Sequence, residues 1–346
     1  MFQRADILTI FALSKIFYRA QVLPLPASYA TKFEKEISSF LWKGHMTRNV
    51  LSRDTVCLSK DHGGLGIPHI RLKCRSLFVK QIFRSITGNS RGRDFIDFWL
   101  GARLGLPQLS SSFFHLRGRP GRESDATPPL FLSALKFISK SLEEQHFLPT
   151  DIEDITTKNI YRCLLEDLPV PVIVHKHPDR NWSQTWKRLK SGVLSSEAKS
   201  FLYLLVHERV GTKECGHRLM PGRYPSSGCP NCGIVETINH RYCQCINVSE
   251  AWEWLRAKIV SLDISLDVTD DMEFLTLCFE MGLRENAILW LLGVFVEIVE
   301  TEVVLRGNKL SVTSAKGIFK QRKQLSRHQA IPELGIILGL DTEGIG

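Results

Sequence analysis

Four potential metal ligands follow one another at short spacing in this chain: Cys229-x2-Cys232-x7-His240-x4-Cys245. Three thiolates and one neutral imidazole form a ligand set that a single tetrahedral zinc ion accepts. Pro230 and Gly233 lie in and beside the first cysteine pair, where they favour the tight turn that lets both sulfurs reach one metal. A disulfide would not need the histidine. The spacing therefore predicts a zinc site that constrains the fold of this segment.

The predicted site supplies four protein ligands, which is the closed shell of a structural zinc site and leaves no open position for a catalytic water. Cys243 competes with Cys245 for the position of the fourth ligand. Cys215 and His217 are close enough in sequence to act as substitutes. We favour Cys245. Zinc is then expected to stabilise a small loop-rich segment, with its binding free energy contributing to folding.

The composition of the 346 residues is that of an ordinary globular protein, with room for two or three domains and a real hydrophobic core. Nine cysteines in a chain of this length do not suggest a disulfide framework, so we expect a reducing compartment, nuclear or cytoplasmic. The apolar run from Ile7 to Leu13 is soon followed by Lys15 and Arg19, and the run from Ala287 to Val296 is about half the length that a bilayer needs. No membrane segment is expected.

A net charge of +9 and a pI near 9.1 indicate an anionic partner, and nucleic acid is the partner that this balance favours. The basic residues are grouped rather than spread evenly. One group alone would usually be a solvated face, but five groups in one chain favour contact with a phosphate backbone. The groups are Arg71, Lys73 and Arg75; Arg84, Arg91, Arg93 and Arg103; Arg117, Arg119 and Arg122; Lys187, Arg188 and Lys190; and Lys316, Lys320, Arg322, Lys323 and Arg327.

The hydrophobic pattern predicts a mainly α protein in four stretches: a helical region at 1–90, a connector at 91–165, a zinc-binding region at 166–262 and a helical region with a basic tail at 263–346. In the first stretch, apolar residues at helical spacing predict a helix that ends before Pro24, and a second, antiparallel helix that closes at Gly44. A third helix is expected to begin near Pro68. In the connector, a helical piece is expected near Leu130 to Leu142.

Gly63, Gly64 and Gly66 predict a turn between these helices. A phosphate-binding loop is disfavoured, because neither the Lys-Ser/Thr of a P-loop nor a GxGxxG spacing is present. In the third stretch Trp182, Trp186 and Trp252 lie beside basic residues and could stack on bases. We favour a core role for them, because a small metal domain otherwise lacks apolar mass.

Two segments of the chain resemble the reverse transcriptases of LINE-type non-LTR retrotransposons. The first is similar to the thumb-side region after the palm in that family, where a helix leads to a Tyr and a Leu-Pro turn, a second helix ends in Phe-Leu-Trp-x-Gly, and a Gly-Gly-Leu-Gly turn follows. The matching positions are Tyr18, Leu25-Pro26, Phe40-Leu41-Trp42-Lys43-Gly44 and Gly63-Gly64-Leu65-Gly66-Ile67.

The second segment, Trp182 to Trp252, is similar to the zinc-binding region near the C-terminus of those polyproteins. It shares a Trp-rich entry, a final Cys, a trailing Trp and further motif positions: Phe201, His207, Gly211-Thr212, the C-x2-C pair and Glu236-Thr237 before His240. The resemblance covers roughly half of the chain. It implies a helical thumb-like bundle, a connector, and a small zinc-stabilised domain followed by C-terminal helices.

The chain lacks the aromatic-x-Asp-Asp element that holds the two catalytic metal ions of a polymerase. Asp270-Asp271 is its sole adjacent aspartate pair, and we expect this pair to cap a helix that begins near Met272. The resemblance thus implies a non-catalytic C-terminal fragment that grips template RNA or target DNA for an upstream reverse transcriptase core. The expected phosphate contacts are Arg71, Lys73, Arg75, Lys187, Arg188 and Lys190.

Two alternatives remain open at this point. The chain could be a stand-alone zinc-dependent nucleic-acid-binding protein derived from such an element. It could also be a nonfunctional remnant whose helices still encode a core.

Overall fold

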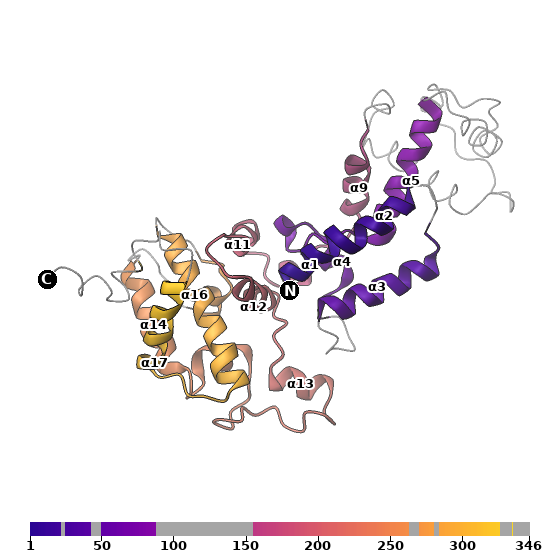
Figure 1. Ribbon diagram of the computed structural model, residues 1–346. Helices are drawn as coiled ribbons and strands as arrows, with labels where there is room; N and C mark the ends of the chain where they lie inside the picture. Colours follow the sequence, from indigo (N-terminus) through magenta and orange to yellow (C-terminus); the bar gives the residue numbers. More distant parts are fainter. Residues whose placement is uncertain are drawn as a thin grey trace. The chain divides into compact units, whose positions relative to one another are not determined.

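The computed structural model describes residues 1–21, 25–42, 50–87, 155–262, 270–279, 284–325 and 334 (Figure 1). These segments are helical, and the β-structure within them is a single isolated bridge between Gly228 and Val235. The prediction of a mainly α protein is confirmed. Several predicted features lie outside the described residues: the helical piece at Leu130 to Leu142, most of the connector, and the arginines Arg91, Arg93, Arg103, Arg117, Arg119, Arg122 and Arg327.

The chain divides into two compact units. The first unit comprises Met1–Gln3, Lys60–Gly63 and Val170–Gly346, and the second comprises Arg4–Ser59 and Gly64–Pro169. The division at Val170 lies close to the boundary expected at 166. The regions expected at 166–262 and 263–346 belong almost entirely to one unit, because their helices pack on one another.

The second unit is built from helices joined by short turns. The N-terminal helix runs through α1 (Phe2–Ile7), a π-helical segment η1 (Leu8–Leu13) and α2 (Ser14–Ala20), and is followed by α3 (Ala27–Leu41), α4 (Arg53–Cys57), α5 (Ile70–Thr87) and α9 (Thr157–Glu166). The Arg4 guanidinium donates to the carbonyl oxygen of Phe40 at 3.2 Å, so the start of the first helix lies beside the end of α3. The expected antiparallel arrangement of these two helices agrees with this contact.

Helix α5 is the centre of the second unit, because α2, α3 and α9 all pack against it. Val79, Ile82 and Phe83 recur at helical spacing on α5 and are fully buried. Leu13 of η1 and Ile160 of α9 are also fully buried. Burial of each such side chain stabilises the fold by roughly 1.5–3 kcal/mol.

The glycine-rich segment at 63–66 is a turn, as its sequence predicts. Its backbone N–H groups are used within the turn: Gly64 donates to Ser59, Leu65 to Val56 and Gly66 to Leu58, at 2.9–3.0 Å. A Cβ on Gly64 would lie 1.9 Å from the Leu58 carbonyl oxygen, so the close approach of these two backbones requires glycine. With these donors occupied, the turn offers no cradle to a phosphate.

The first unit contains the remaining helices: η2 (Lys60–His62), α10 (Val172–Lys176), α11 (Trp182–Leu189), α12 (Ser196–Val206), α13 (Lys213–Leu219), η6 (His240–Gln244), α14 (Ser249–Leu262), α15 (Asp271–Leu275), α16 (Glu285–Ile298), η7 (Val299–Leu305) and α17 (Val312–Leu325). Asp270 caps α15 by accepting from the Met272 N–H at 2.9 Å. The predicted capping role of the aspartate pair is therefore confirmed for Asp270.

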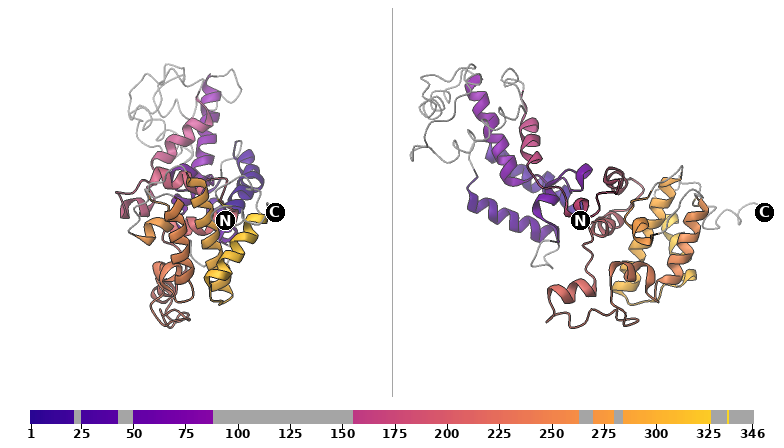
Figure 2. Two further views of the ribbon diagram at one scale, coloured as in Figure 1. Left: turned by 90° about the vertical axis from the view of Figure 1, so that its left-hand side faces the viewer. Right: turned by 180° about the vertical axis from the view of Figure 1, so that it is seen from behind.

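Helix α16 forms the core of the first unit and is buried along Ala287–Ile298. Helices α12 and α17 pack on it, and α14 packs on α17, so that α14, α16 and α17 lie side by side in two views (Figures 1 and 2). Trp252 contacts Phe295 with ring centroids 5.3 Å apart. Within the segments that the structure describes, none of the helices combines the length and apolarity needed to cross a bilayer.

The tryptophans at the entry of the zinc-binding region belong to the core, as predicted. Trp182 and Trp186 are buried and stack with centroids 5.2 Å apart, and Trp186 stacks in turn on His207 at 5.3 Å. The Gly63 carbonyl oxygen accepts hydrogen bonds from Tyr203 Oη at 2.9 Å and His207 Nε2 at 3.0 Å. These rings are closed to nucleic-acid bases because protein atoms surround them.

Candidate metal centre

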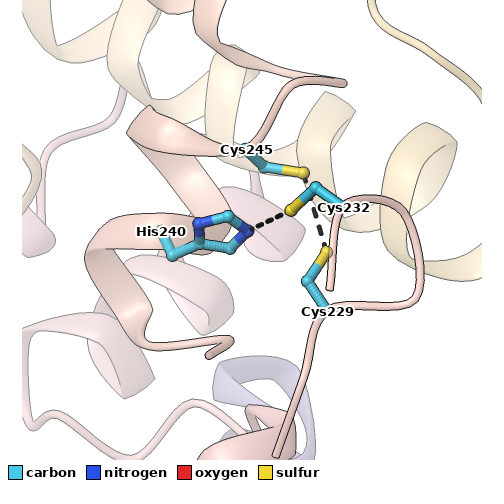
Figure 3. A group of neighbouring side chains, drawn as sticks. All are labelled: Cys229, Cys232, His240 and Cys245. Carbon is cyan, nitrogen blue, oxygen red and sulfur yellow. Dashed lines mark hydrogen bonds between the residues drawn. The ribbon is translucent and has the colours of Figure 1, made fainter. Parts of the chain in front are cut away.

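The structure brings together the four predicted ligands. The Sγ atoms of Cys229, Cys232 and Cys245 and a ring nitrogen of His240 all lie within 4.8 Å of one another (Figure 3). The sulfurs of Cys229 and Cys245 are 3.8 Å apart, and Cys232 Sγ is 3.2 Å from His240 Nε2. A tetrahedral metal with bonds of about 2.3 Å to sulfur separates two ligand sulfurs by about 3.8 Å. The cluster could therefore hold a metal ion.

A tight hairpin positions the first two ligands. The Cys229 carbonyl oxygen accepts from the Gly233 N–H at 2.9 Å, and the Cys229 N–H donates to Ile234 at 2.7 Å. Gly233 has a φ of +77°, in the left-handed region that side chains with a Cβ rarely adopt. This tight turn places the sulfurs of Cys229 and Cys232 on the same side of the hairpin, as the positions of Pro230 and Gly233 predict.

A single helical turn, η6, positions the other two ligands. The His240 N–H donates to Thr237 Oγ1 at 3.0 Å, which anchors the start of the turn. At its end the Cys245 N–H donates to the His240 carbonyl oxygen at 2.7 Å. His240 and Cys245 are thereby held on the same side of the turn and are both buried.

The alternative ligands lie elsewhere. Cys243 is buried but does not belong to the cluster, so Cys245 is the fourth member. Burial, reinforced by Asp271 and Asp270, raises the pKa of the Cys243 thiol far above its usual range. His217 donates from Nδ1 to the Tyr224 carbonyl oxygen at 2.8 Å, on the separate helix α13 that also carries Cys215.

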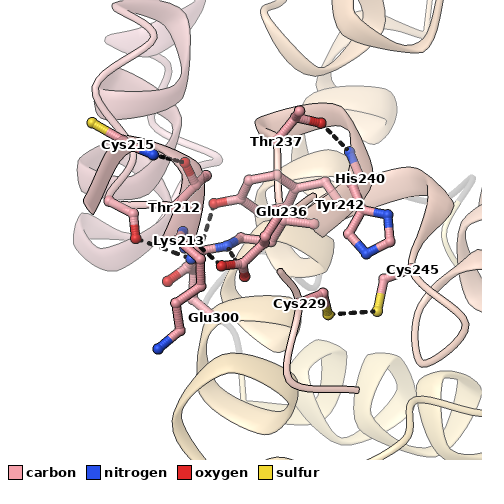
Figure 4. A network of polar contacts seen from close by, with 12 residues as sticks. Thr212, Lys213, Cys215, Cys229, Glu236, Thr237, His240, Tyr242, Cys245 and Glu300 are labelled. Carbon is pink, nitrogen blue, oxygen red and sulfur yellow. Dashed lines mark hydrogen bonds and ion pairs between the residues drawn. The ribbon is translucent and has the colours of Figure 1, made fainter. Parts of the chain in front are cut away.

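A buried ionic network supports the segment between the two ligand pairs (Figure 4). Arg241, next to His240, pairs with Glu236 at 3.1 Å and with Glu300 of η7 at 3.3 Å. Tyr242 donates to the same Glu300 carboxylate at 2.6 Å, and the Lys213 N–H donates to Glu236 at 2.8 Å. The segment that carries the Cys/His cluster is thus connected both to α13 and to η7, which follows α16.

The network raises the pKa of two of its members, Arg241 and Tyr242. Burial acts to lower the pKa of Arg241, but Glu300 and Glu236 outweigh this effect and the pKa is raised. Burial and the Glu300 carboxylate raise the pKa of Tyr242 well above 10. In the cluster itself, burial raises the pKa of the Cys229 thiol to about 11. Because metal ligands are thiolates, a bound dication would displace this proton.

Three of the predicted phosphate contacts lie in the second unit, on α5. Arg71 is exposed, yet its Nε donates to buried Glu34 at 3.0 Å. The Lys73 amine lies 5.0 Å from the centre of the Tyr161 ring, and desolvation lowers its pKa. Desolvation also lowers the pKa of Arg75, although Asp167 partly opposes this. Arg71 presents the most accessible charge of the three.

The other three predicted contacts lie in the first unit, on and beside α11. Lys187 and Lys190 are exposed, and Lys190 pairs with Asp61. Arg188 is only 2% exposed, and its Nη1 donates to the carbonyl oxygens of Leu277 at 2.8 Å and Phe279 at 2.6 Å. The expectation for Arg188 is therefore withdrawn, because its guanidinium satisfies interior carbonyls and cannot reach a phosphate.

The sequence analysis gave no role to Arg241 or Glu300 and named Glu236 only as a motif position of the resemblance, whereas all three form the network beside the cluster. Glu236 lies within the spacer before His240 and Arg241 directly follows it, so charged residues in and beside a metal-binding loop were the available signal. Glu300 carried no such signal, because it lies far along the chain in an apolar segment. In comparisons with known proteins, the chain matches no family model and no curated protein.

Proposed function

We propose that this chain is a zinc-stabilised nucleic-acid-binding protein, corresponding to the C-terminal part of a LINE-type reverse transcriptase. The observation that carries the proposal is the cluster of three thiols and one imidazole, with its 3.8 Å sulfur separation and its buried setting. Three sulfurs and one nitrogen favour zinc over the hard cations, which prefer oxygen ligands.

Zinc at this site would have a structural role, because the four protein ligands complete its coordination shell. Cys229 and Cys232 come from the hairpin, and His240 and Cys245 come from η6 and its end. A metal ion would join these two elements. Arg241, which directly follows the ligand His240, connects this metal-binding segment to η7 through its ion pair with Glu300.

Nucleic acid is the partner that the charge balance supports. With a net charge of +9, the chain attracts polyanions over a distance set by the ionic strength. Lys187 is exposed and could lie against a phosphate; Arg71 and Lys190 are also exposed but are paired with Glu34 and Asp61, and Lys73 and Arg75 are partly buried. Contacts of this kind position a nucleic acid without reading its sequence.

An apolar stripe on the N-terminal helix supports the proposed upstream partner. Ile10, Phe11 and Tyr18 lie at helical spacing and are 62%, 65% and 77% exposed. A contiguous apolar face on a soluble chain commonly marks an interaction surface. We propose that the upstream reverse transcriptase core covers this stripe, which would leave the present chain to grip the template or the target without performing catalysis itself.

The nucleic-acid part of the proposal is tested by fluorescence anisotropy on the full chain loaded with zinc. The probes are a labelled RNA, a DNA duplex and an RNA–DNA hybrid, titrated at about 50 mM and about 200 mM salt. We expect binding that weakens steeply with salt and a shallower salt slope for Lys187→Gln. A folded, zinc-loaded chain that binds none of the three probes at low salt would refute the proposal.

A further inference from the structure

The last described helix, α17, is strongly cationic. Between Val312 and Leu325 it carries four basic residues and no carboxylate. Its apolar side is already used, because Ala315 and Phe319 are buried in the bundle against α14 and α16. The exposed surface of α17 is therefore polar and positive.

The four cations of α17 divide between two sides of the helix. At 100° per residue, the two exposed lysines Lys316 and Lys320 lie about 40° apart around the helix axis. Arg322 lies on the other side, with Nη2 3.6 Å from the buried Glu297 carboxylate. We call Lys316 and Lys320 the lysine ridge, and leave out Lys323 because it is half-buried and makes a further interaction within the protein. Arg322 is excluded because its guanidinium is paired with Glu297.

Aromatic packing fixes the side of α17 on which the ridge lies. The Lys316 amine is 5.7 Å from the centre of the Trp254 ring, and that ring packs on Phe319 with centroids 5.7 Å apart. Lys316 and Lys320 are exposed, and in the described part of the chain neither amine lies within 4 Å of a carboxylate. Glu250 of α14 is paired with Lys309 at 3.2 Å.

We propose that the lysine ridge is a phosphate-backbone binding site for nucleic acid. The proposal rests on the function proposed above and gives it a surface in the C-terminal helices. A rise of 1.5 Å per residue spaces Lys316 and Lys320 about 6 Å apart along α17. Ammonium groups in such a row neutralise successive phosphates as point charges, without base specificity.

An anionic membrane is the other partner that a basic helix could suggest. Helices that bind in the membrane interface insert an apolar face beneath their basic residues. In α17 the apolar face is formed by Ala315 and Phe319, which are buried within the protein. The ridge therefore has charge to offer but no apolar face to insert, and this favours a nucleic acid.

The test compares Lys316→Gln/Lys320→Gln with a matched control, Lys32→Gln/Lys35→Gln, in the zinc-loaded full chain. The control removes two exposed lysines from helix α3, so both variants lose the same net charge. The readout is the slope of log K against log salt for the RNA–DNA hybrid. We expect the slope to fall by about 2 in the ridge variant, at about 0.9 per lost phosphate contact, and to stay unchanged in the control.

Each outcome has a defined meaning. An unchanged slope in the ridge variant, or an equal fall in both variants, would overturn the ridge while wild-type binding preserved the proposed function. Absence of wild-type binding would overturn both. A ridge variant that kept its hybrid affinity but lost binding to phosphatidylserine vesicles would overturn the nucleic-acid assignment. Lys316→Arg/Lys320→Arg, which keeps the charge, should retain the wild-type slope if its thermal melt is also unchanged.

Discussion

At the scale of single residues, Gly63 shows why the glycine-rich turn has its sequence. Its φ is +81°, and a Cβ placed on it would lie 2.7 Å from the Trp186 ring. The same residue offers its carbonyl oxygen to both Tyr203 and His207. The turn is therefore explained by packing and hydrogen bonding within the protein, with no ligand required.

Gly63→Ala is expected to destabilise the chain by about 2–4 kcal/mol, since it combines overpacking with a left-handed backbone. Urea unfolding of the zinc-loaded protein measures this change in the free energy of unfolding. Gly192→Ala is the matched control, because no atom lies within 4 Å of a Cβ at that position. Equal stability of the two variants would contradict the packing role of Gly63.

His207 makes stability depend on pH. Burial lowers its pKa to about 4, although the hydrogen bond to Gly63 opposes the shift. The unfolded chain therefore takes up this proton more readily than the folded chain, and stability falls as pH drops from about 6.5 to about 4. At pH 5 the expected loss is about 2 kcal/mol relative to pH 7.5.

Denaturant unfolding of the wild type and of His207→Gln at pH 5 and pH 7.5 measures this loss of unfolding free energy. The glutamine can still donate to the Gly63 carbonyl but does not titrate. A pH dependence of the same size in the variant would mean that other groups cause it.

At the scale of elements, the ionic network joins the metal-binding loop to the C-terminal helices. Arg241 is buried with two carboxylate partners, Glu236 before it and Glu300 on η7. Removing one member of a buried network costs more than the network itself contributes, because an uncompensated charge is left behind.

Arg241→Met is expected to destabilise the protein by about 3–5 kcal/mol, because two buried carboxylates lose their partner. Adding Glu236→Gln and Glu300→Gln should recover part of this loss, since no net charge then remains. Arg306→Met is a suitable control, because Arg306 is exposed and its pair with Glu302 is worth at most about 1 kcal/mol. Equal denaturation midpoints for Arg241→Met and the control would argue against the network.

The elements that sequence predicted well are those whose causes are local. The hairpin at Cys229 and Cys232 follows from Pro230 and Gly233, and the Asp270 cap follows from a residue two positions away. Long-range contacts were not predictable. Arg188 was placed on a phosphate because its neighbours are basic, whereas its partners Leu277 and Phe279 lie in a distant segment that no local pattern connects to α11.

At the scale of the whole molecule, the chain divides into two units with different roles in the proposal. The first unit contains the Cys/His cluster, the ionic network and the lysine ridge. The second unit carries Arg71 and the exposed apolar stripe. Zinc is central to this account, because it would stabilise the loop that the network connects to the bundle.

The most direct test is the zinc content per chain of residues 1–346, measured by elemental analysis after gel filtration. The account predicts one zinc per wild-type chain, retention of the metal in Cys243→Ala, and its loss in His240→Ala and Cys245→Ser together with a lower melting temperature. A folded wild-type chain that contains no zinc, or metal lost from Cys243→Ala but kept in Cys245→Ser, would contradict it.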